Sequence, residues 1–92
     1  MMMKKSVLDK MRDMMESARH FAFEAHRKKD FFGEDKKIYC ALKAGLDALA
    51  DAYGLDKDKI EWYLLSEKVF VIDFMPVDEF VAIFKKNKKE AA

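Results

Sequence analysis

The stretch that decides the fold is SVLDKMRDMMESARHFAFEAHRKK, residues 6–29, which contains neither Gly nor Pro. Its apolar residues recur at alternating separations of four and three positions: Val7, Met11, Met14, Ala18, Phe21 and Ala25. This period places them along one side of an α-helix that can pack on a core. The sequence therefore predicts a helix from Ser6 to about Lys29, with Ser6 as the candidate N-cap and Gly33 as the residue that terminates the helical pattern.

A second helix is predicted from Glu34 to Tyr53. Its first turn carries Glu34 and Asp35, which suit the positive end of the helix dipole, and Gly54 stands at the C′ position. Its apolar face is rich in small residues: Ala41, Ala44, Gly45, Ala48 and Ala52. Small side chains let a partner helix approach closely, so we expect the two helices to form an antiparallel hairpin. The large Met and Phe side chains of the first helix would then fill the space above the small residues of the second.

Residues 60–74 allow two interpretations. The runs WYLL, residues 62–65, and VFVI, residues 69–72, are rich in aromatic and β-branched residues and are separated by a short polar segment, residues 66–68. This pattern favours a β-hairpin. The alternative is a short helix that begins with a capping box formed by Asp58 and Glu61. The hairpin is the interpretation we prefer from the sequence.

A final helix is predicted to begin near Pro76 and to run to about Lys88. Proline suits the first turn of a helix, and Asp78 and Glu79 follow it, while lysines gather at the other end. Residues 1–92 therefore read as one small domain of the α+β class, mainly helical, with a helical hairpin, a β-hairpin and a C-terminal helix. An all-α small bundle is the alternative.

The composition argues against several kinds of chemistry. Apolar residues make up 51% of the chain and charged residues 38%, so few hydroxyl or amide side chains are available for catalysis: the chain has three Ser, no Thr and no Gln. Cys40 is the only cysteine, and no Gly-rich phosphate loop is present. Glu16, His20 and Glu24 are spaced by four on one helix face, but a metal site needs ligands from a second element. Salt bridging of His20 with these acids on a solvated face is the interpretation we prefer for this spacing. We expect no catalytic residues, no metal and no cofactor.

The charge, the lengths of the apolar segments and the cysteine count also bear on where in the cell the protein is found. The net charge is +1, and the apolar segments are far shorter than the roughly 20 residues that cross a bilayer. The apolar stretch that follows the N-terminal lysines is only Val7 and Leu8 before Asp9, which is too short for the core of a secretory signal. With a single cysteine there is no disulfide framework. We therefore expect a cytoplasmic protein that does not bind membranes.

An excess of aromatic residues near the end of the first helix points to a binding surface. Phe23 falls on the side of the helix opposite the apolar seam, between Arg19 and Arg27, and Phe31 and Phe32 follow. Exposed apolar surface flanked by charge is typical of protein interfaces. These five residues predict a non-enzymatic protein-binding module, acting as an adaptor, a regulator or a stoichiometric inhibitor. Trp62 and Tyr63 are second choices, because both could belong to the core.

Two other kinds of partner fit parts of the pattern. Arg12, Arg19 and His26 recur every seven residues, so the first helix could lay a basic stripe along a nucleic-acid backbone, although Asp13 and Glu16 on the same half oppose this. A homodimer is also possible. Residues 1–33 carry eight Lys and Arg against five Asp and Glu, whereas residues 34–75 carry six against nine, so the two regions have opposite charge.

Overall fold

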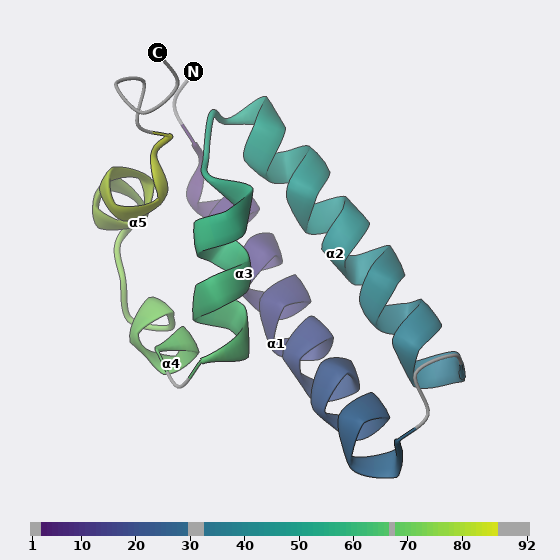
Figure 1. Cartoon of the computed structure of the whole chain (residues 1–92). Coiled ribbons are helices and arrows are strands. Elements are labelled where there is room, and N and C mark those ends of the chain that lie inside the picture. The colour runs from purple at the N-terminus through teal and green to yellow at the C-terminus, as the bar shows by residue number, and fades with distance from the viewer. Residues whose placement is uncertain (1–2, 30–32, 67, 87–92) are drawn as a thin grey trace.

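The computed structural model of this chain is all-helical over the residues that it describes (Figure 1). These are residues 3–29, 33–66 and 68–86. They contain five helices and no strand: α1 (Lys5–Lys28), α2 (Glu34–Ala52), α3 (Lys57–Leu65), α4 (Val69–Ile72) and α5 (Val77–Phe84). The all-α alternative therefore fits, and the α+β assignment is wrong in its β part.

Helices α1 and α2 pair as the antiparallel hairpin that the sequence predicts (Figure 1). Two of the predicted ends differ. The N-cap of α1 is Lys4 rather than Ser6, with no side-chain hydrogen bond, and the helix ends at Lys28 because Lys29 turns into the left-handed region at φ 56°. Gly33 is the N-cap of α2, not the residue that terminates α1.

The close approach of α1 and α2 is clearest at Gly45. A Cβ atom added to this residue would lie 2.6 Å from the Cε atom of Met14, which is far inside van der Waals contact. The Met14 side chain therefore occupies the space that a larger residue at position 45 would need. This confirms, at this position, that methionine from α1 fills the space above the small residues of α2.

The predicted β-hairpin at residues 60–74 is wrong. Asp56 accepts hydrogen bonds from the backbone N–H groups of Asp58 and Lys59, so it caps α3 in place of Asp58. Ile60 and Leu64, four positions apart, are then both buried against the rest of the core. A strand would place WYLL on alternating faces. β-propensity is weak against such tertiary packing, and burial of a helical i, i+4 pair decides the structure here.

The last helix, α5, is shorter than predicted. Pro76 is its N-cap, and the helix ends at Phe84, because Lys85 is extended and pairs with Leu55 in an isolated antiparallel bridge. The carbonyl of Phe84 accepts a hydrogen bond from the backbone N–H of Asp56 at 2.7 Å. Residues 87 and 88, where the predicted helix would have ended, lie outside the described residues.

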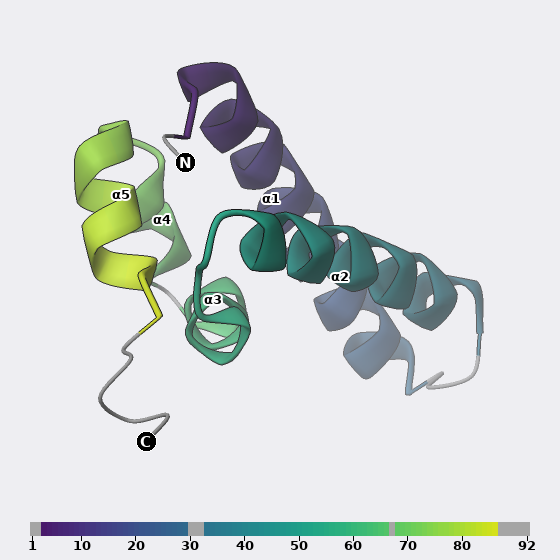
Figure 2. The ribbon, with the colours of Figure 1, turned by 90° about the horizontal axis from the view of Figure 1, so that it is seen from above.

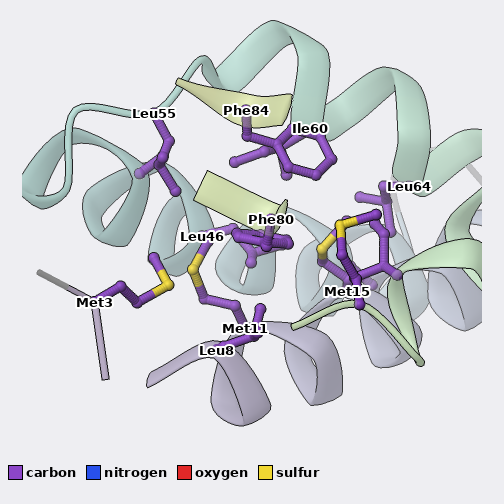
Figure 3. Close-up of a cluster of buried hydrophobic side chains, with 14 of the residues drawn as sticks. Met3, Leu8, Met11, Met15, Leu46, Leu55, Ile60, Leu64, Phe80 and Phe84 are labelled. Carbon is purple, nitrogen blue, oxygen red and sulfur yellow. The ribbon is translucent and has the colours of Figure 1, made fainter. Parts of the chain in front are cut away.

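One hydrophobic core joins all five helices (Figure 3). Its largest fully buried side chains are Phe80, Phe84, Leu8, Met11, Met15, Leu46, Leu55, Ile60, Leu64 and Ile72. These side chains gather where α3, α4 and α5 pack on one end of the α1–α2 hairpin. The other end, where α1 finishes and α2 begins, projects past the short helices (Figures 1 and 2). Residues in the second half of α1 therefore face the boundary between the core and the projecting end.

Candidate functional site

Arg19 lies at this boundary and connects α1 to the end of α3. Its Nη1 atom donates hydrogen bonds to the carbonyl oxygens of Leu64, at 2.9 Å, and Ser66, at 2.6 Å. Leu64 lies in the last turn of α3 and Ser66 is the C-cap, so the guanidinium supplies donors to carbonyls at the end of this helix. The Ser66 carbonyl also accepts a hydrogen bond from the backbone N–H of Val69, at 3.4 Å. The guanidinium carbon also lies 4.4 Å from the ring centre of Phe23 and 5.5 Å from that of Phe70. Arg19 therefore makes cation–π contacts with an aromatic ring of its own helix and with one of α4.

Phe23 forms one wall of a groove between α1, α2 and α3. Its side chain is 44% exposed, and Leu65 of α3, which lines the same groove, is 42% exposed. The groove encloses about 460 Å³ and has six further lining residues: Ala22, Ala25, His26, Lys36, Tyr39 and Glu61. This volume falls within the range of roughly 300–1,000 Å³ that is usual for ligand pockets. The groove is therefore large enough to take apolar side chains from a partner.

Charged side chains stand along the α2–α3 side of the groove. Lys36 lies over the ring of Tyr39, with its Nζ atom 5.1 Å from the ring centre. Glu61 is 3.6 Å from Lys43, which also bonds to Asp47 at 2.6 Å. Burial, and secondarily the negative charge of Glu61, raises the pKa of Tyr39, so its hydroxyl stays protonated at neutral pH. The groove thus offers an apolar floor, a neutral phenol and one lysine that has no carboxylate partner among the described residues.

The five partner-binding residues predicted from the sequence separate into three groups. Phe23 lines the groove, and its ring contacts the guanidinium of Arg19. Arg27 lies on the outer side of α1 and donates to Glu24 at 2.6 Å. Phe31 and Phe32 lie outside the described residues. The structure therefore brings together two of the five, and Arg19 is partly exposed and lines a smaller hollow beside α4 rather than the groove itself.

Several exposed apolar residues were missed in the sequence. Phe70 is 59% exposed, Val71 58% and Phe74 91%, all on or just after α4. Leu65 was also missed, and Trp62, a second choice, is exposed rather than core. The β-hairpin interpretation concealed them, because it paired residues 69–72 with residues 62–65 and assigned the apolar side chains of both runs to strand faces. The helical spacing of the buried Val69 and Ile72 is the signal that separates inward from outward positions.

The basic stripe proposed for nucleic acid is largely engaged within the chain. The Nε atom of Arg12 donates to the carbonyl of Ile72 at 2.9 Å, and one of its terminal nitrogens donates to the carbonyl of Met75. Arg19 makes the corresponding contacts to α3, and His26 lines the groove. Two of the three stripe residues therefore point toward backbone carbonyls of α3 and α4 instead of outward.

A metal centre is not formed by the described part of the chain. Within residues 3–29, 33–66 and 68–86, no three His, Cys, Asp or Glu side chains lie close enough to hold a metal ion. Glu24 is bonded to Arg27, which removes one member of the Glu16, His20 and Glu24 row from consideration. Cys40 is exposed on α2, and the described residues include no other cysteine.

Comparisons with known proteins identify no relative that would assign a role to this site. No protein-family model, no curated protein and no solved structure matches the chain. None of the described helices is both long and apolar enough to cross a membrane. The candidate site therefore rests on the contacts, exposure and charge of its own residues.

Proposed function

We propose that this chain is a non-enzymatic protein-binding module whose groove beside Phe23 takes an apolar segment of another protein. The observation that carries the proposal is the pair Phe23 and Leu65, two large apolar side chains that stay more than two-fifths exposed while lining one groove. Exposed apolar residues that converge on a hollow are typical of recognition surfaces. An adaptor, a regulator and a stoichiometric inhibitor all need such a surface.

The fixed position of Phe23 supports this role. Its ring is held by the guanidinium of Arg19, which is itself bonded to two carbonyls of α3. An aromatic side chain that is already ordered loses little rotamer freedom when a partner covers it, so more of the contact energy remains for affinity. The predicted role of Arg19 changes accordingly: it positions the anchor residue and need not touch the partner.

The charges near the groove suggest how a partner is oriented. Lys36 stands at the rim, and Arg27 and Lys29 lie exposed at the end of α1. Carboxylates flanking the apolar residues of the bound segment would be attracted to these cations. Such rim contacts chiefly affect the association rate and the choice of partner. Because Arg12 and Arg19 bond to backbone carbonyls, no observation favours nucleic acid as an equal candidate.

The test is affinity capture from the native host with three versions of the full chain: wild type, Phe23→Ala and Phe74→Ala. Phe74→Ala is the matched control, since it removes an equally large exposed ring from a different face. We expect one protein to be retained by wild type and Phe74→Ala, and its recovery to fall about tenfold with Phe23→Ala, as for an interface anchor worth about 1.4 kcal/mol or more.

Two results would contradict the proposal. Equal recovery by Phe23→Ala and wild type would show that the groove is not the binding surface. Loss of the captured protein after nuclease treatment would show that nucleic acid bridges the two. Circular dichroism melting of each variant shows whether a loss of binding reflects a loss of folding.

A further inference from the structure

The exposed side of α4 is a second apolar surface, distinct from the groove. The helix buries Val69 and Ile72 and leaves Phe70, Val71 and, just beyond its end, Phe74 toward solvent, with exposures of 59%, 58% and 91%. We call these three residues the α4 face. Burial contributes almost nothing to the stability of the fold at a Phe that is nine-tenths exposed. Three exposed apolar side chains within five residues, on and just after one short helix, form the kind of apolar patch that marks an interaction surface.

The α4 face is held by contacts on both sides of the segment. Arg12 donates to the carbonyls of Ile72 and Met75, and Met75 is buried in the core. At the start of the segment, the hydroxyl of Ser66 accepts a hydrogen bond from the backbone N–H of Lys68 at 3.2 Å. The backbone that displays the three side chains is therefore anchored before any partner arrives, which lowers the entropy cost of covering them.

The charges at the two ends of the α4 face are opposite. Lys68 precedes it, and its ammonium group contacts only the ring of Trp62 among the described residues, at 5.3 Å. Asp73 lies at the other end, exposed and without a hydrogen bond or ion pair to any described residue. Asp73 also lines a hollow of about 240 Å³ together with Glu16, Arg19 and His20 of α1, so both acidic and basic groups surround it. The opposite charges at the two ends of the α4 face are therefore those of Lys68 and Asp73 themselves.

We infer that the α4 face is the contact surface of a homodimer. In a two-fold symmetric contact each residue of the patch meets the same patch of the second copy in reverse order. Two antiparallel α4 segments would bring Lys68 of each copy to Asp73 of the other and pack the apolar residues between them. A second copy supplies this reversed charge pattern automatically, whereas an unrelated partner would have to reproduce it. This goes beyond the proposed function, because it uses neither Phe23 nor Leu65.

The first test is the mass of the purified full chain by sedimentation equilibrium, from micromolar to millimolar concentration. We expect the mass to rise from the monomer value of 10.8 kDa toward twice that value. Val71→Asp places a carboxylate at the centre of the contact and should abolish the rise, while Phe23→Ala should leave it unchanged. A wild-type chain that stays monomeric throughout, as it would if a different protein covers this face, overturns the inference. So does a dimer that is unaffected by Val71→Asp.

A charge-reversal pair tests the antiparallel arrangement itself. Lys68→Glu alone gives two acidic ends and Asp73→Lys alone gives two basic ends, so each homodimer would face repulsion at both contacts. We expect each variant alone to raise the dissociation constant about tenfold at low salt, since two exposed pairs are reversed. An equimolar mixture of the two variants restores both attractive contacts and should dimerise as well as wild type. A mixture that associates no better than its components overturns the arrangement. Circular dichroism confirms that each variant is folded.

Discussion

The α1–α2 hairpin and the segment of three short helices that follows it, residues 57–84, are stabilised in different ways. The hairpin consists of two long helices whose apolar residues repeat with the helical period and meet over small residues such as Gly45. The segment consists of helices of nine, four and eight residues, which are too short to persist alone. Its stability therefore comes from core packing and from contacts with α1.

Arginines on α1 show the same difference within one helix. Arg27 bonds to Glu24, three residues away, and stabilises its own helix locally. Arg12 and Arg19 instead reach carbonyls that are 60 and 45 residues away in sequence, respectively Ile72 and Leu64. The comparison indicates that α1 acts as the support on which α3 and α4 are assembled. The changes below test this difference between the hairpin and the short-helix segment, from the largest expected effect on stability to the smallest.

Phe84→Ala should disrupt the short-helix segment most strongly. Its side chain is fully buried, with its ring centre 4.7 Å from that of Phe80 and 4.8 Å from that of Tyr63. Removing a buried Phe ring costs about 3–5 kcal/mol, since both transfer energy and packing are lost. Urea denaturation followed by circular dichroism measures the change. At low micromolar concentration, where the chain is monomeric, Phe74→Ala on the exposed side of the same region should lower the free energy of unfolding by less than about 0.5 kcal/mol. Similar losses in the two variants would contradict the placement of the core.

Arg19→Met should loosen the end of α3 while leaving the hairpin intact. The substitution keeps the apolar stem but removes the donors to Leu64 and Ser66, leaving two carbonyls without their charged partner. We expect a loss of about 1.5–3 kcal/mol, the usual range for hydrogen bonds to a charged group. Hydrogen exchange should accelerate in α3 more than in α2.

Arg27→Met is the matched control for Arg19→Met. It removes an exposed ion pair with Glu24 on the same helix, so we expect the free energy of unfolding to fall by less than about 0.5 kcal/mol. Equal losses from the two arginines would mean that the contacts between α1 and α3 do not stabilise the segment.

Much of the hairpin could be predicted from the sequence, because one period runs through each helix. The positions of α1 and α2 follow from the 4-3 spacing and from Gly54, and the packing of Met14 follows from the small residues of α2. The end of α1 could not be predicted, since Lys29 adopts a left-handed conformation that the sequence pattern places at Gly33. Glycine is the residue that usually adopts this conformation at the end of a helix, so a lysine at position 29 gives no local signal that the helix ends there.

The short-helix segment and most of the candidate site could not be predicted. Residues 62–65 and 69–72 have β-rich composition, and their helical form depends on Arg12, Arg19 and the core, which are distant in sequence. Phe23 was identified because it departs from the period of its own helix. Leu65 and Phe74 were not identified, because no reliable period was assigned to their region. The exposure of a side chain can be predicted from the sequence only where its secondary structure has been assigned correctly.

Gly45→Ala tests the close packing within the hairpin. Replacing a glycine inside a helix by alanine stabilises the helix by about 1 kcal/mol. Here the added Cβ forces the Cε of Met14 to move, which offsets the gain, so we expect a net change within about 0.5 kcal/mol. When Met14 is already alanine, the same substitution should give the full gain. A double-mutant cycle measured by urea denaturation gives the coupling, and a cycle without coupling would show that Met14 does not fill this space.

Protonation of Glu24 should have the smallest effect on stability. It should also distinguish the contact of Arg27 with a carboxylate from the contacts of Arg19 with backbone carbonyls. The hydrogen bond from Arg27 is the main cause that lowers the pKa of Glu24 below its ordinary value of 4.5. Burial opposes it, and the positive charges of Arg27 and Lys28 add to the lowering. A lowered pKa in the folded chain stabilises it above about pH 4.5, and this contribution is lost as the pH falls through the folded value. Titration by NMR should show the pKa of Glu24 rising toward 4.5 in Arg27→Gln. An unchanged pKa would exclude the hydrogen bond. The partners of Arg19 are backbone carbonyls, which do not titrate, so mild acid should weaken the outer pairs of α1 before it loosens the attachment of α3.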